Sequence, residues 1–208
     1  DLAFWVALAN NPQIGAKTIL KLEKVFQPIN KLFKPGHLKK LNRLAISENI
    51  RVEIRKVVLK TNPKEELNKL KKLGIKPVSI RCNRYPKLLL EIPDPPAVLF
   101  TKGDIYESQE LSLAVVGARK YSNYGKRVVQ DIVRTLAQTG ITILSGLALG
   151  IDSIAHRTAL GAGCRTIGVL ANGLDQIYPS SNRTLAERIL ASGGALISEY
   201  PPGVPPYK

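Results

Sequence analysis

The sequence contains few of the side chains from which metal centres and disulfide frameworks are built. Among its 208 residues, only Cys82 and Cys164 are cysteines and only His37 and His156 are histidines. The two cysteines are far apart and form no C-x-x-C pair, which argues against a disulfide scaffold and against a zinc site. We therefore expect neither a metal nor a cofactor, and this cysteine usage is typical of the reducing cytoplasm.

Long hydrophobic runs are also missing. No stretch of the chain approaches the roughly 18 apolar residues that indicate a membrane-spanning helix. The chain does not open on a basic segment followed by an apolar one, which is the pattern of a secretory leader. We therefore expect a soluble cytoplasmic protein without a membrane partner. Because the chain starts at Asp1 and contains no methionine, we do not expect residue 1 to be the native start.

Acidic side chains are scarce, with 16 Asp and Glu against 31 Lys and Arg, so the net charge is +15. A cationic surface attracts polyanions, chiefly nucleic acid and anionic membranes. Most of the excess lies in residues 1–80, which hold 17 basic and 6 acidic side chains. A solvated, lysine-rich helical surface accounts for part of that excess. A membrane-surface role is disfavoured, because no strongly amphipathic helix rich in Trp and Phe is present.

We expect two domains, a small helical domain over residues 1–62 and an α/β domain over residues 63–208. Apolar side chains recur at helical spacing within the first domain, as in residues 16–26. The stretch NPQIGAKTILKLEKVF (11–26) resembles a helix-hairpin-helix element, in which a glycine turn exposes backbone amides to a DNA phosphate. A SAM-like helical fold and a plain helical corner are alternative interpretations of the same pattern.

From residue 111 onward, apolar strands alternate with helices. The strands are nearly continuous apolar runs, as expected when helices cover both faces of a parallel sheet. This alternation predicts a doubly wound, mostly parallel α/β sheet. The expected strands are 111–117, 141–145, 165–171 and 195–200, and the expected helices are 122–139, 152–161 and 182–192. Two earlier strands are expected at 76–80 and 97–103, with an irregular proline-rich connection between them.

Two glycine turns follow strands of this sheet, VVGARKYSNYG (115–125) and SGLALGID (145–152). Neither turn fits a nucleotide-binding fingerprint. A P-loop requires G-x-x-x-x-G-K-[ST], but Gly146 and Gly150 are one residue too close and Ile151 stands in place of the lysine. A dinucleotide site requires G-x-G-x-x-G and a carboxylate at the end of the next strand, which neither turn has. ATP hydrolysis and NAD chemistry are therefore disfavoured.

These turns are suited to anion binding, because glycine lets the backbone approach a phosphate and the following helix begins with unpaired N–H groups. Asp152 is the expected N-cap of the helix after the second turn. His156 lies one turn later and is interpreted as a packed, hydrogen-bonded core residue. Ser145 lacks the G-x-S-x-G elbow of a hydrolase, so we expect no catalytic role for Ser145, Asp152 or His156.

Arg119 stands in the first glycine turn, where we expect its guanidinium to clamp a phosphate. A solvated surface arginine is the alternative interpretation. Tyr121 and Tyr124 are candidates for stacking on the bases of a single strand, although half-buried helix residues would give the same pattern. The turn after the expected strand 165–171 brings Asn182 and Arg183 to the same edge of the sheet.

Four stretches of the chain together resemble the DNA-processing protein A family (DprA, also called Smf). They are VVGARKYSNYG (115–125), ILSGLALGIDSIAHRTAL (143–160), TIGVLANGLDQIYPSSNRTL (166–185) and ALISEYPPGVPP (195–206). The second stretch is a specific signal, and the likeness extends over residues 75–208.

The resemblance implies an extended Rossmann-like fold that binds single-stranded DNA, protects incoming DNA in natural transformation and loads the RecA recombinase onto it. It also implies a homodimer without catalytic activity. The phosphate pocket it implies consists of Gly117, Ala118, Arg119, Ser145, Gly146, Gly150 and Asn182, with Lys120, Tyr121, Tyr124, Asp152, His156 and Arg183 as stacking or supporting residues. In the family an aromatic and arginine-containing stretch follows SEYPPG. Because this sequence ends at Lys208, we expect the α/β domain to be incomplete at its C-terminus.

An enzyme is the alternative hypothesis. Related Rossmann-like proteins cleave the glycosidic bond of nucleoside monophosphates, and a phosphate pocket would suit such a substrate. That activity would require a P-G-G-x-G-T-like loop with a trailing glutamate, and the sequence contains none.

Overall fold

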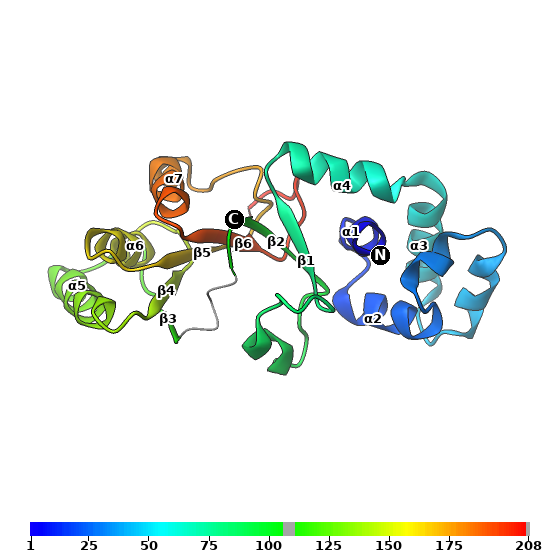
Figure 1. Ribbon diagram of the computed structural model, residues 1–208, viewed down its shortest axis with the longest axis horizontal. Helices are drawn as coiled ribbons and strands as arrows, with labels where there is room; N and C mark the ends of the chain where they lie inside the picture. Colours follow the sequence, from blue (N-terminus) through cyan, green and yellow to red (C-terminus); the bar gives the residue numbers. More distant parts are fainter. Residues whose placement is uncertain (106–110, 207–208) are drawn as a thin grey trace. The chain divides into compact units, whose positions relative to one another are not determined.

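The computed structural model describes residues 1–105 and 111–206 (Figure 1). The folded chain divides into two compact units, Asp1–Leu99 and Phe100–Lys208. The domain boundary expected after residue 62 stays a prediction. So does the likeness of the first helices to a helix-hairpin-helix or SAM-like module. No helix in the described ranges is long and apolar enough to cross a membrane.

The first unit begins with helices whose apolar faces share one core. Trp5, Leu8, Leu22 and Ile54 are all buried there. The helices are α1 (Leu2–Ala9), α2 (Ala16–Val25), α3 (Glu48–Lys60) and α4 (Pro63–Lys72), with 3-10 helices η1 (Ile29–Phe33) and η2 (His37–Arg43) between α2 and α3. The start of α4 follows from local chemistry, because Asn62 accepts a hydrogen bond from the Lys64 amide and Pro63 occupies the first turn.

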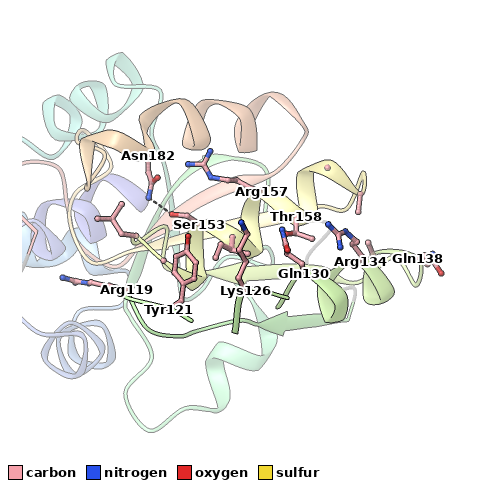
Figure 2. A pocket seen from close by; sticks show the side chains of 16 residues that line it. Arg119, Tyr121, Lys126, Gln130, Arg134, Gln138, Ser153, Arg157, Thr158 and Asn182 are labelled. Carbon is pink, nitrogen blue, oxygen red and sulfur yellow. Dashed lines mark hydrogen bonds between the residues drawn. The ribbon is translucent and has the colours of Figure 1, made fainter. Parts of the chain in front are cut away.

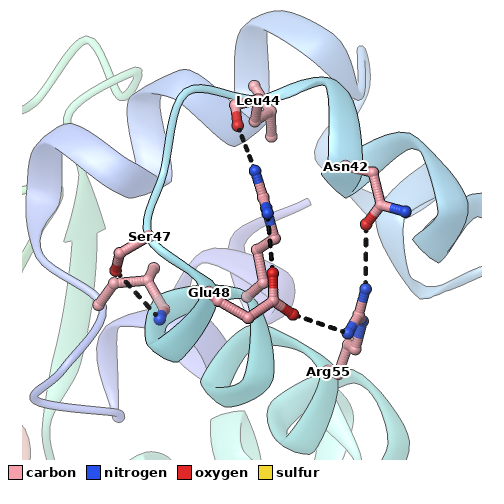
Figure 3. A network of polar contacts seen from close by, with 7 residues as sticks. Asn42, Leu44, Ser47, Glu48 and Arg55 are labelled. Atoms are coloured by element: carbon pink, nitrogen blue, oxygen red, sulfur yellow. Dashed lines mark hydrogen bonds and ion pairs between the residues drawn. The ribbon is translucent and has the colours of Figure 1, made fainter.

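Some basic side chains of this unit form hydrogen bonds and ion pairs within the unit itself. Figure 3 shows Glu48, in the first turn of α3, between two arginines of the same helix. Arg51 Nη1 donates to Glu48 Oε2 at 2.8 Å, and Arg55 Nη1 donates to Glu48 Oε1 at 3.3 Å. The other guanidinium nitrogens reach the segment before α3, Arg51 at the Leu44 carbonyl and Arg55 at the side chain of Asn42 in η2. The hydrogen bond from Arg51 lowers the pKa of the Glu48 carboxyl.

Within the described residues, the sheet contains six strands in the order β1-β2-β6-β5-β4-β3. The neighbours β3–β4, β4–β5 and β5–β6 are parallel, whereas β2 pairs with β6 antiparallel. The strands are β1 (Lys76–Ser79), β2 (Val98–Gly103), β3 (Ser112–Ala114), β4 (Thr142–Ser145), β5 (Thr166–Leu170) and β6 (Ala195–Ser198). The prediction of a mostly parallel α/β sheet is therefore confirmed. The connection expected to be irregular between β1 and β2 contains only the short 3-10 helix η3 (Lys87–Glu91).

Three helices follow the parallel strands, and α6 packs between α5 and α7 (Figure 1). They are α5 (Asn123–Ala137), α6 (Ile151–Gly161) and α7 (Arg183–Ala191), the last preceded by the 3-10 turn η5 (Ser180–Asn182). Ile143 of β4 is fully buried in a cluster with Val133 of α5 and Ala155 and Ala159 of α6. This packing fixes the α5–α6 pair over the sheet.

The strand expected over residues 111–117 is shorter than predicted, because its regular part ends at Ala114. Val116 beyond it is 79% exposed and lies in the first glycine turn. Since β3, β4 and β5 run in parallel, their carboxyl ends lie at one edge of the sheet. The turns that lead into α5, α6 and α7 therefore meet at this edge, which we call the rim.

Candidate functional site

The two glycine turns are in direct contact at the rim. The amide of Ile151 donates to the Ala118 carbonyl at 3.2 Å, which ties the start of α6 to the turn after β3. Gly150 has φ +88°, and a Cβ at this position would lie 2.7 Å from the Arg119 Cα and would also collide with the Ala118 carbonyl. Only glycine fits here without moving one of the turns.

Gly117 and Gly146 make room for the first turn of α6. A Cβ on Gly117 would lie 2.7 Å from Ile151 Cγ1, and one on Gly146 would lie 2.7 Å from Asp152 Oδ2. These two glycines are thus required by the packing of the chain itself. Their contact with a phosphate stays a prediction.

Ser145 and Asn182 support the rim from within, because both are buried. Ser145 Oγ donates to the Val115 carbonyl at 2.7 Å and so joins the end of β4 to the end of β3. Asn182 Nδ2 donates to the Leu147 carbonyl at 2.8 Å and to Ser153 Oγ at 2.9 Å (Figure 2). The structure therefore gives both side chains a positioning role, and their predicted phosphate contact remains a prediction.

The loop that Asn182 holds has an unusual backbone. Leu147 has φ +59°, a value that no other non-glycine residue of the described chain approaches. A left-handed leucine costs roughly 1–2 kcal/mol relative to a right-handed conformation. The hydrogen bond from Asn182 to its carbonyl helps to hold this conformation, and Ser153 Oγ adds a bond to the next carbonyl, Ala148, at 2.5 Å.

The prediction that Asp152 caps α6 is wrong. The N-cap is Gly150, and Asp152 lies in the first turn of the helix. Its side chain turns back toward the loop, where Oδ2 accepts a hydrogen bond from the Ala148 amide at 3.3 Å. A carboxylate in this position still interacts favourably with the positive end of the helix dipole.

His156 is fully buried and lies away from the rim surface. Its Nδ1 is 2.7 Å from Thr166 Oγ1, and the Thr166 hydroxyl donates its single proton to the Ile143 carbonyl at 2.8 Å. The histidine must therefore carry a proton on Nδ1 and donate to Thr166. Burial lowers the pKa of His156 to about 4, against a smaller opposing effect of the Ser145 backbone. The ring is neutral at pH 7.

A groove of about 1020 Å³ begins at the rim and runs between α5 and α6. Among the predicted residues, it brings together Arg119, Tyr121, Gly150 and Asn182. In Figure 2 the Tyr121 ring points toward α6, while Arg119 lies at one end of the groove. The groove is not lined by the other predicted residues Gly117, Ala118, Lys120, Tyr124, Ser145, Gly146, Asp152, His156 and Arg183. Tyr124 is 78% exposed, so it is not the half-buried helix residue of the alternative interpretation.

Sequence reasoning missed several residues of this groove. Lys126, Gln130 and Arg134 line it from α5, and Arg157 lines it from α6. The spacing of four residues between the α5 side chains places them on one helix face. That spacing was visible in the sequence, but the face that α5 turns toward α6 depends on packing. Within residues 1–105 and 111–206, no three His, Cys, Asp or Glu side chains gather as a metal site would require.

The chain is similar to known DNA-processing proteins. Residues 76–208 match the family model described as DNA recombination-mediator protein A. Protein Smf of Escherichia coli (strain K12) is 47% identical over 122 residues, which are 59% of this chain and 33% of that protein. DNA processing protein DprA of Bacillus subtilis (strain 168) is 43% identical over 136 residues, which are 65% of this chain and 46% of that protein. The chain thus spans less than half the length of these curated relatives.

Two solved structures are also similar. The X-ray structure of DprA from Streptococcus pneumoniae matches 99% of this chain and 69% of its own, with a TM-score of 0.79 and 28% identity. The structure of DprA from Helicobacter pylori, which concerns its single-stranded DNA binding mode, matches 64% of this chain and 59% of its own. Its TM-score is 0.56 at 32% identity.

The contact between the glycine turns predicts a strong effect of Gly150→Ala. We expect the free energy of unfolding to fall by roughly 2–4 kcal/mol, because a left-handed alanine is strained and its Cβ displaces the Ala118–Arg119 backbone. Gly161→Ala at the other end of α6 is the matched control, since its Cβ would meet nothing within 4 Å. Urea denaturation of both variants gives the comparison. Equal stabilities would contradict the close approach of the two turns.

The buried His156 predicts a pH dependence of stability. Its pKa of about 4 in the folded state lies below the ordinary value near 6.5, so the unfolded chain binds the proton first as the pH falls. The free energy of unfolding should therefore decrease by about 1.4 kcal/mol per pH unit between pH 6.5 and 4 from this group alone. His156→Asn keeps a donor near the Nδ1 position and should lack this part of the slope. Parallel pH profiles for parent and variant would refute the assignment.

Proposed function

The chain belongs to the DNA recombination-mediator protein A family, and on that premise we propose that it binds single-stranded DNA through the phosphate backbone. The rim is the proposed binding surface. Gly150 and Ile151 bring the N-terminus of α6, which attracts anions through its dipole, next to the turn that carries Arg119. The contacts are electrostatic, so binding depends on salt and little on base sequence.

The observation that supports this proposal most is the position of Arg119. Its side chain is exposed at the end of a groove whose charged lining residues are all cations. An arginine fork there matches two phosphate oxygens. Tyr121, 46% exposed in the same groove, offers a ring on which a base stacks.

We propose that the protein is not an enzyme. The three side chains that a hydrolase would use have separate internal partners: Ser145 bonds to Val115, Asp152 to Ala148 and His156 to Thr166. A histidine that donates to Thr166 from the buried core is not placed to take a proton from Ser145, whose hydroxyl donates to Val115.

The wider role rests on the family alone. We propose that the protein protects incoming DNA during natural transformation, acts as a homodimer in the cytoplasm, and loads the RecA recombinase onto the bound strand. Relatives named DNA processing protein DprA in Bacillus subtilis and Streptococcus pneumoniae support the connection with DNA processing.

Arg119→Gln should weaken the binding of fluorescein-labelled oligo(dT), oligo(dA) and mixed-sequence single strands to the same extent. We expect at least a tenfold loss of affinity, because one charge-assisted hydrogen bond contributes roughly 1.5–3 kcal/mol and each 1.4 kcal/mol is about a factor of ten. Fluorescence anisotropy at several salt concentrations measures both the affinity and the salt slope, which is the slope of the logarithm of the binding constant against the logarithm of the salt concentration. This slope should become shallower by about 0.7 for one lost phosphate contact.

Arg127→Gln is the matched control, because Arg127 is an exposed cation of α5 that does not line the groove. It removes the same charge and should change affinity much less than Arg119→Gln. If the two variants bound equally well, the proposed role of Arg119 would be wrong. If the parent bound no single strand at low salt, the proposed function itself would fail.

A further inference from the structure

The groove between α5 and α6 extends well beyond the rim, and its far part has no role in the function proposed so far. Resting on that proposed function, we propose that the groove is a second backbone-binding surface, along which Lys126, Arg134 and Arg157 guide the single strand away from Arg119. The partner is the same DNA strand, recognised there by its phosphates.

The first support is the placement of the side chains. Lys126, Gln130 and Arg134 follow one another at intervals of four residues and so form a row along α5. Arg157 and Thr158 line the groove from α6 (Figure 2). The row from Lys126 to Arg134 spans about 12 Å at 1.5 Å per helical residue. A stacked strand carries roughly three phosphates over this length, at about 3.4 Å per nucleotide.

The second support is the charge of the groove. Its charged lining residues are Arg119, Lys126, Arg134 and Arg157, with no carboxylate among the residues that line it. Arg134 makes an ion pair with Asp131 at 3.5 Å, but both side chains are largely exposed, and such pairs contribute little. As far as the structure describes the chain, the other three cations form no ion pair with a carboxylate. Uncompensated cations along a concave surface focus a positive potential toward an anionic ligand.

The third support is the shape and chemistry of the walls. Gly161, the last residue of α6, and Ala162 after it also line the groove, and neither carries a large side chain. Gln130 and Thr158 add uncharged groups that can donate hydrogen bonds to phosphate oxygens. A concave groove with cations along its walls suits a single strand, whereas an anionic bilayer is bound by an apolar helix face flanked by cations.

The test is a pair of charge-matched double variants. Lys126→Gln/Arg157→Gln removes two cations of the groove, and Arg127→Gln/Arg188→Gln removes two exposed cations outside it. Labelled oligo(dT) of about 20 nucleotides is titrated with each protein by anisotropy at several salt concentrations. Thermal unfolding of each variant verifies that it is folded, and Lys126→Arg/Arg157→Lys, which keeps both charges, tests for rescue.

We expect the groove variant to bind at least tenfold more weakly than the control variant and to lose about 1.4 from the salt slope, at roughly 0.7 per phosphate contact. The charge-keeping variant should retain the parent slope. Combining the groove changes with Arg119→Gln should give additive losses, because separate phosphates are contacted.

The outcomes separate this inference from the proposed function. If the parent binds and Arg119→Gln weakens binding, but the groove and control variants have equal affinities and slopes, only the groove inference is overturned. If the parent binds no oligonucleotide, both are overturned. If the groove variant keeps its DNA affinity but loses binding to phosphatidylserine vesicles, the groove is a membrane surface and the inference is overturned.

Discussion

The close approach of Gly150 to the Ala118–Arg119 backbone is the constraint on which the rim depends. It sets the start of α6 against the turn after β3, and the bond from the Ile151 amide to the Ala118 carbonyl fixes that arrangement. Two buried side chains stabilise the surrounding loops through hydrogen bonds. Ser145 donates to the Val115 carbonyl at the strand ends, and Asn182 donates to the Leu147 carbonyl in the loop before α6. The backbone that carries Arg119 is consequently held from inside, and a preorganised backbone loses less conformational entropy when it binds a phosphate.

The distribution of charge over the surface says more about where a DNA strand would bind than the total charge does. The first unit carries most of the positive excess, but Glu48, Glu53 and Glu66 hold several of its basic side chains in ion pairs. The second unit has a smaller excess, yet the cations of its groove lie along one concave surface without a carboxylate among them. A pI near 9.9 indicates an affinity for polyanions, and only the arrangement of side chains indicates where a strand would lie.

The sequence predicted the fold well because its signals are local. Apolar runs such as the one around Ile143 mark buried parallel strands, and the glycine turns mark the transitions into helices.

The sequence predicted the candidate site less completely than the fold. Asp152 was expected to cap α6, but the N-cap is Gly150 and the Asp152 carboxylate accepts a hydrogen bond from the Ala148 amide instead. The partners of Asn182 could not be predicted, since Leu147 is 35 residues away in the chain. The row from Lys126 to Arg134 is periodic in sequence, but only the packing of α5 against α6 indicates that it lines a groove.

Amide chemical shifts of isotope-labelled protein, recorded during titration with unlabelled oligo(dT), test most directly whether the two glycine turns at the rim hold phosphates of a single strand. If they do, the largest shifts should occur at the amides of 117–119 and 146–150, and they should reverse on raising the salt concentration. Shifts confined to residues 1–99, with the amides of both glycine turns unchanged at saturation, would contradict phosphate binding at the rim.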